Sequence, residues 1–171
     1  MLNKIICCSA LSLFAVLSLS NCASCGGAKV EVGGVIRLTL PDGWRTMPSA
    51  HDDLDAAVYL ANSSFGAFVR VIPAPGVKLT PLEAARILLP ELAKAHYGFL
   101  PSQLPAEDHG QDVVITYQND LEDDAGKLIV KAVPGRPDLI AVFVGVCLIR
   151  YTEAAFADLD SIAASVQAIK K

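Results

Sequence analysis

The sequence lacks any concentration of positive charge. Its 14 lysines and arginines are interspersed with 18 aspartates and glutamates, and its longest basic run is Lys170-Lys171. Nucleic-acid binding relies on a clustered basic face, so this absence argues against a nucleic-acid partner. The modest net charge of -4 favours solubility of the folded part.

Glycine and cysteine pairs are present, but not in patterns that support cofactor chemistry. Gly26-Gly27 and Gly33-Gly34 lack the further glycines or the lysine of a phosphate-binding loop. Cys22-Ala-Ser-Cys25 has C-x-x-C spacing, yet no second cysteine pair accompanies it as a zinc site would require. Cys147 lies in an apolar run, which is typical of a small buried side chain. We therefore expect no cofactor and no metal site.

The first 21 residues have the features of an export signal. Lys4 supplies a positive start, and the uncharged apolar stretch from Ile5 to Leu19 has the length of a signal-peptide core. A membrane-spanning helix needs about 20 apolar residues, which this stretch does not reach. We predict that residues 1–21 are a cleaved signal peptide, with a retained membrane anchor as the alternative.

The segment that follows carries a cysteine in a distinctive context. Leu19-Ser20-Asn21-Cys22 resembles the lipobox of bacterial lipoproteins, in which the cysteine sulfur receives diacylglycerol; Asn21 stands where that motif usually has glycine or alanine. The resemblance implies that Cys22 is the lipid-modified first residue of the mature protein and that residues 22–29 form a flexible lipidated tether. Ordinary cleavage near Ala23, which would release a periplasmic protein, is the alternative.

Residues 30–171 are enough for a single domain with its own core. Alternating apolar residues predict a strand over Val30–Leu40, closed by a turn at Pro41-Asp42-Gly43. A short extended piece begins at Trp44. Residues 56–60 and 67–72 predict an antiparallel hairpin around Asn62-Ser63-Ser64.

The second half begins with a helix and continues with strands. Thr80-Pro81-Leu82-Glu83 is a capping-box sequence and predicts a helix to about Tyr97. Strands follow over 112–118, 127–133 and 139–149, separated by turns at 119–126 and 134–138, and the most apolar strand, 139–149, is expected at the sheet centre. Thr152 caps a final amphipathic helix to about Ile169. The predicted class is α+β, an antiparallel β-sheet flanked by helices.

This order of elements, with Ile36-Arg-Leu-Thr-Leu-Pro-Asp-Gly-Trp44 near its start, resembles the PsbP-like superfamily, which includes DcrB-like bacterial lipoproteins. Its members open with a strand ending in a Leu-Pro-x-Gly-Trp turn, carry a long helix midway and close with a three-strand meander and a helix. The resemblance covers about residues 30–169. It implies an α/β/α sandwich in a family of extrinsic, assembly or binding proteins without shared catalysis, and it transfers no site residues.

The polar segments offer weak candidates for chemistry. His51-Asp52-Asp53 with Asp55 could bind a cation through oxygen, and Asn119–Asp124 is similar, but both lack the spacing of a calcium loop. Asp108-His109 could form part of a catalytic triad, but the sequence has no Gly-x-Ser-x-Gly motif to supply the nucleophile. His96 has the residue type favoured at a helix C-terminus. We therefore expect no catalytic residue. Trp44 is expected to pack on the rim of the core, with a surface anchor as the less favoured role.

The sequence thus predicts a non-enzymatic cell-envelope lipoprotein. A lipid anchor would hold it on the inner or outer membrane, with its domain facing the periplasm or the exterior. The domain would bind an unknown envelope protein or support assembly, with specificity in loops 48–55, 73–80 and 98–111. A periplasmic small-ligand or metal-binding module is the alternative, and a hydrolase using His51 or His109 is less favoured.

Overall fold

The computed structural model describes residues 27–47, 57–74, 76, 79–94, 98–105, 107 and 110–170. The strands are β1 (Lys29–Val32), β2 (Ile36–Thr39), β3 (Arg45–Met47), β4 (Ala57–Ala61), β5 (Phe65–Pro73), β6 (Val113–Asn119), β7 (Asp124–Val133), β8 (Arg136–Leu148) and β9 (Gln167–Ala168). The α-helices are α1 (Pro81–Lys94) and α2 (Thr152–Ala164), and short 3-10 turns are η2 (Pro101–Gln103) and η3 (Ile149–Tyr151). The predicted α+β class is confirmed. The predicted signal peptide and most of the predicted tether lie outside the described residues.

Within the described residues, the larger sheet has the strand order β3-β4-β5-β8-β7-β6, and every neighbouring pair is antiparallel. The β4–β5 hairpin is confirmed, and the Asn62 side-chain oxygen accepts the backbone N–H groups of Ser64 and Phe65 at 2.8 Å. Strand β8 lies between β5 and β7, and its residues from Leu139 to Val144 are buried. The most apolar strand therefore occupies the sheet centre, as predicted.

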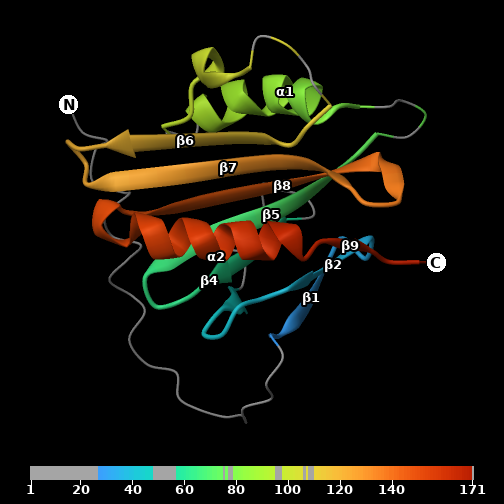
Figure 1. Cartoon of the computed structure of the whole chain (residues 1–171), viewed down its shortest axis with the longest axis horizontal. Coiled ribbons are helices and arrows are strands. Elements are labelled where there is room, and N and C mark those ends of the chain that lie inside the picture. Colours follow the sequence, from blue (N-terminus) through green and yellow to red (C-terminus); the bar gives the residue numbers. More distant parts are fainter. Residues whose placement is uncertain are drawn as a thin grey trace.

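The helices cover opposite faces of this sheet, which gives the α/β/α arrangement (Figure 1). Helix α1 packs with Phe99 on one face. Helix α2 packs on the other face together with a smaller sheet of order β1-β2-β9. Lys127 of β7 ties α2 to the sheet through a 2.6 Å bond to Asp160. The domain is therefore layered around two cores, one on each side of the larger sheet.

The helix α1 begins as its sequence predicts. The Thr80 N–H donates to the Glu83 carboxylate at 2.9 Å, and the Glu83 N–H donates to the Thr80 hydroxyl at 3.2 Å. This reciprocal pair is a capping box and satisfies two donors that the helix leaves free. The last residues predicted for this helix, up to Tyr97, lie outside the described residues.

The predicted single strand over Val30–Leu40 is wrong, because the segment is a hairpin of β1 and β2. Gly33 and Gly34 adopt φ angles of 59° and 64°, which only glycine takes up readily. The Val35 N–H closes the turn on the Val32 carbonyl at 3.2 Å. The chain therefore reverses at the glycine pair and pairs with itself.

The predicted final helix to Ile169 is also wrong in its second half. Helix α2 ends at Ala164, and the Ser165 hydroxyl accepts the Thr39 N–H at 2.9 Å. The chain after it becomes β9, which pairs antiparallel with β2. Pairing with a strand 130 residues earlier in the chain is a long-range effect, so the local helical pattern could not reveal it.

Two local predictions need smaller corrections. Thr152 does not cap α2, because its hydroxyl donates to the Ile149 carbonyl at 2.7 Å and Tyr151 holds the N-cap position. The turns predicted at 119–126 and 134–138 are shorter, since β7 already begins at Asp124 and β8 at Arg136. Both strands run further toward the sheet ends than their apolar cores indicate.

Candidate functional site

Most residues singled out for chemistry lie outside the described residues. This applies to the predicted lipidation site Cys22, to His51, Asp52, Asp53 and Asp55, and to His96, Asp108 and His109. Whether these residues lie near one another is therefore outside what the structure describes. Of the three predicted specificity loops, it describes parts of the second and third.

Trp44 of the Leu-Pro-x-Gly-Trp segment is buried and serves the fold. The Pro41–Trp44 turn closes through a 3.2 Å bond from the Trp44 N–H to the Pro41 carbonyl, with Gly43 at a φ of 83°. The indole N–H donates to Asp158 of α2 at 2.8 Å, and the ring meets Phe65 edge to face at 5.2 Å. Trp44 thus joins the turn after β2 to α2, as the packing interpretation predicts.

Cys147 is a buried free thiol, as its apolar context predicts. Burial raises the pKa of the Cys147 thiol, and the nearby Asp124 carboxylate acts in the same direction, while a hydrogen bond with Thr152 lowers it. The thiolate is the reactive form of cysteine, so this environment makes Cys147 a poor nucleophile.

Two surface hollows of the described residues are open to solvent and have few reactive groups in their linings. One, of about 410 Å³, lies where β2 meets α2 and is lined by Asp42, Ser161 and Ser165 among others. The other, of about 500 Å³, lies between Arg136 and the segment around β9. Neither has a histidine or cysteine in its described lining, so neither supplies a reactive thiol or pairs a serine with a histidine base. Within the described ranges, no group of three or more His, Cys, Asp or Glu residues could hold a metal ion.

A better candidate lies at the tip of the β6–β7 hairpin, where Leu121 is 97% exposed. The tip is fixed by local bonds. The Leu121 N–H donates to the Asn119 side chain and the Glu122 N–H to the Asn119 carbonyl, both at 3.2 Å. Asp123 then takes the left-handed conformation, with a φ of 54°. The leucine is thus presented by an ordered turn rather than by a loose loop.

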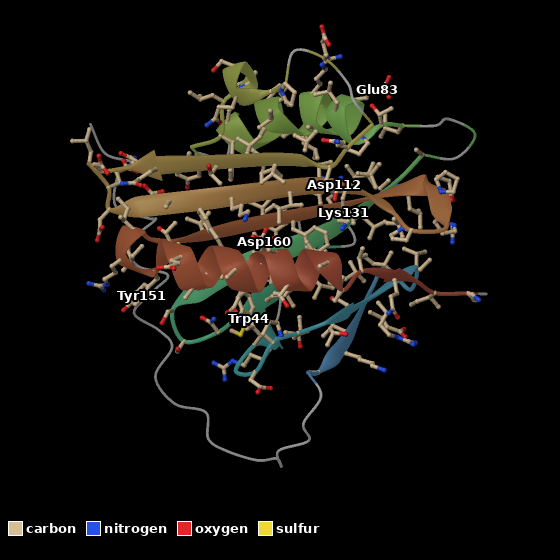
Figure 2. All side chains as sticks on the ribbon, in the orientation of Figure 1. Trp44, Glu83, Asp112, Lys131, Tyr151 and Asp160 are labelled. Atoms are coloured by element: carbon tan, nitrogen blue, oxygen red, sulfur yellow. The ribbon has the colours of Figure 1, made fainter. Side chains whose placement is uncertain are left out.

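The adjoining turn η3 adds an aromatic and a cation. The Ile149 N–H donates to the Asp123 carbonyl at 3.2 Å, which fastens η3 to the hairpin tip. Arg150 stands 5.0 Å over the Tyr151 ring, which lies where α2 begins (Figure 2). Tyrosine and arginine are enriched at the energetic centres of protein interfaces.

We define the hairpin-tip surface as Asp120, Leu121, Glu122, Asp123, Arg150 and Tyr151. It carries three negative charges and one positive charge beside two exposed large side chains, Leu121 and Tyr151, and this combination suits binding to a protein. The sequence interpretation missed this surface, because it treated 119–124 as a solvated acidic turn. The signal was an isolated leucine inside an acidic run.

The described helices include none that is long and apolar enough to cross a membrane.

Comparison with known proteins gives structural likeness without sequence likeness. No protein-family model matches the chain, and no curated protein matches its sequence. The structure is similar to cyanobacterial PsbP (CyanoP) from Synechocystis sp. PCC 6803, with a TM-score of 0.58 and 12% identity over 90% of this chain and 99% of that one. It is also similar to a mutant of the protein Mog1, with a TM-score of 0.55 and 11% identity over 84% of this chain and 96% of that one.

A slighter likeness is to LpqN, which is involved in cell envelope biogenesis of Mycobacterium tuberculosis. Its TM-score is 0.45, with 16% identity over 84% of this chain and 86% of that one. The first two likenesses span nearly the whole length of both solved proteins. The chain has the PsbP-like fold.

Proposed function

We propose that the protein is a bacterial cell-envelope lipoprotein of the DcrB-like kind, anchored through Cys22, whose PsbP-like domain binds another protein without catalysing a reaction. The signal-peptide pattern and the lipobox resemblance support the anchor. The hairpin-tip surface supports the binding role. The buried, high-pKa thiol of Cys147 gives no support to a nucleophilic enzyme.

The observation that carries the binding role is the exposure of Leu121. A solitary exposed leucine is ordinary on a protein surface. Leu121 differs because its turn is held by two hydrogen bonds to Asn119 and is fastened to η3 by a third, so the side chain is positioned before any partner arrives. A preordered contact loses little conformational entropy on binding, which favours affinity.

The charges around Leu121 indicate the chemistry of the partner. Asp120, Glu122 and Asp123 surround the leucine in the turn. Carboxylates at the rim of an interface speed the approach of a surface with positive potential and disfavour an acidic one. We infer that the partner has an apolar socket, sized for one leucine side chain, with lysines or arginines at its rim.

Site-specific photo-crosslinking in the producing cell tests this function. A photoreactive residue at position 121 should give one discrete crosslinked product, while the same residue at position 87 should not. Ile87 is the matched control, because it is an apolar side chain on α1 that is 60% exposed. Replacing Asp120 and Glu122 by lysine should remove the product at position 121. Equal crosslinking from both positions, or none from 121, would contradict the proposal.

A further inference from the structure

The first described residues, from Gly27 onward, pack against the β1–β2 hairpin. Gly27 already packs against the end of β2, since a Cβ at this position would overlap the Leu40 carbonyl oxygen. The Leu40 N–H donates to the Ala28 carbonyl at 2.8 Å, and β1 begins at Lys29. The chain is therefore fixed to the β1–β2 hairpin from residue 27 onward.

This leaves a short link to the predicted anchor. Only residues 23–26 separate Cys22 from Gly27. Five Cα–Cα steps span at most about 17 Å when fully extended. An acylated Cys22 lies at the membrane surface, so Gly27, which packs at the open end of the β1–β2 hairpin, cannot stand further from the membrane than this reach.

The outer face of the smaller sheet is suited to a charged membrane surface. Its inward side chains include Val32, Ile36 and Leu38, which are buried, while its outward positions are exposed. Those outward positions are Lys29, Glu31, Arg37, Thr39 and Gln167, and Lys170 lies two residues beyond the end of β9. Among the described residues at these outward positions, two cations accompany one carboxylate, and Lys170 adds a third cation just beyond β9, although the chain as a whole has a net charge of -4.

The polar character of this face also limits how it can meet a bilayer. It has no exposed large apolar side chain among its described residues, so it would lie against headgroups without inserting into the hydrocarbon. Arg37 forms a 2.7 Å ion pair with the Glu31 carboxylate. Lys29 and Lys170 are therefore the cations most available to lipid phosphates. Basic residues near a membrane are attracted to anionic lipids.

We propose that the outer face of the β1–β2–β9 sheet is turned toward the membrane and lies against anionic phospholipid headgroups. This inference rests on the proposed anchoring near Cys22. Helix α1 lies on the far side of the larger sheet and is therefore held away from the bilayer (Figure 1).

Fluorescence quenching in vesicles tests this orientation. The full chain is produced with its leader, recovered from membranes and reconstituted into vesicles of phosphatidylglycerol and phosphatidylcholine that contain a headgroup-quencher lipid. A fluorophore is attached at Gln167→Cys on the smaller sheet or at Ile87→Cys on α1, each combined with Cys25→Ser. The Cys25→Ser chain without an added cysteine measures labelling of the buried Cys147 and, where residues 1–21 are retained or Cys22 is unmodified, of Cys7, Cys8 and Cys22, and this background is subtracted.

The label at position 167 should be quenched several-fold more than the label at position 87. Its quenching should fall when phosphatidylcholine replaces all phosphatidylglycerol, or when Lys29 and Lys170 are changed to glutamine. Equal quenching at the two positions, or stronger quenching at 87, would overturn the orientation and would fit an envelope protein covering this face instead.

The mass of the same sample separates this inference from the proposed function. If Cys22 is acylated and quenching is equal, the orientation alone fails. If the leader is retained without acylation, the lipoprotein proposal fails, and the quenching pattern still decides the orientation, because the chain reaches the domain through Gly27 in either case. A soluble product cut near Ala23 overturns both.

Discussion

Gly126 in β7 is a position where one added methyl group should disturb the domain. It is paired with Tyr117 of β6, whose ring lies over it. A Cβ on Gly126 would overlap the Tyr117 Cε1 atom and lie 2.8 Å from Cζ. The ring has little room to retreat, because its other edge lies over Gly98 and Phe99 meets it edge to face at 4.8 Å.

The expected cost of Gly126→Ala follows from these contacts. Overpacking a filled site costs about 1–3 kcal/mol. If the ring swings away, the Tyr117 hydroxyl also loses its 2.9 Å bond to the Asp124 carboxylate, and a bond to a charged group is worth about 1.5–3 kcal/mol. We therefore expect Gly126→Ala to lower the free energy of unfolding by about 1–3 kcal/mol if the ring stays in place, and by about 2.5–6 kcal/mol if the Tyr117 bond is lost as well.

Urea unfolding of the wild type and the variants provides the measurement. Gly66→Ala is the matched control, since Gly66 lies in β5 and nothing stands within 4 Å of its added Cβ. This control should be neutral or stabilising by up to about 1 kcal/mol, because glycine is entropically costly in a strand. In a Tyr117→Ala background, Gly126→Ala should lose most of its penalty. A Gly126→Ala variant as stable as Gly66→Ala, or an undiminished penalty without the ring, would refute the packing and the β6–β7 register.

Two further predictions concern the core. Trp44→Phe retains an aromatic ring but removes the N–H donor to Asp158, and should lower the free energy of unfolding by about 1–3 kcal/mol in urea titrations; no loss of stability would argue against this bond. Because burial raises the folded-state pKa of Cys147, its stabilising contribution is complete below the unfolded thiol's pKa and is lost as the pH rises through the folded-state pKa. Alkylation at mildly alkaline pH should accordingly be slow in the folded protein and fast in urea, and rapid labelling of the folded form would contradict the burial.

Features set by neighbouring residues were predictable from the sequence. The Thr80–Glu83 capping box and the Asn62 hairpin depend on side chains within three residues of the backbone groups that they bond. The central place of β8 follows from its unbroken apolar run, because only a strand covered on both faces can bury one. The element order then indicated the PsbP-like fold.

Features that depend on distant pairing were not predictable in this way. The register of β9 on β2 and the end of α2 at Ser165 need the Thr39 backbone, which is far away in sequence. The β1–β2 hairpin was available in the Gly33-Gly34 signal, but the alternating residues around it concealed the turn. Leu121 could be seen as unusual, yet its exposure follows from the three-dimensional turn that presents it.

The anchor at Cys22 is tested most directly by the intact mass of the mature protein from membranes of the producing cell, for the wild type and for Cys22→Ala. A lipoprotein predicts a chain that begins at Cys22, carries the added mass of its acyl chains, and loses this form in the variant. An unmodified soluble chain cut near Ala23, or one that retains residues 1–21, would contradict it.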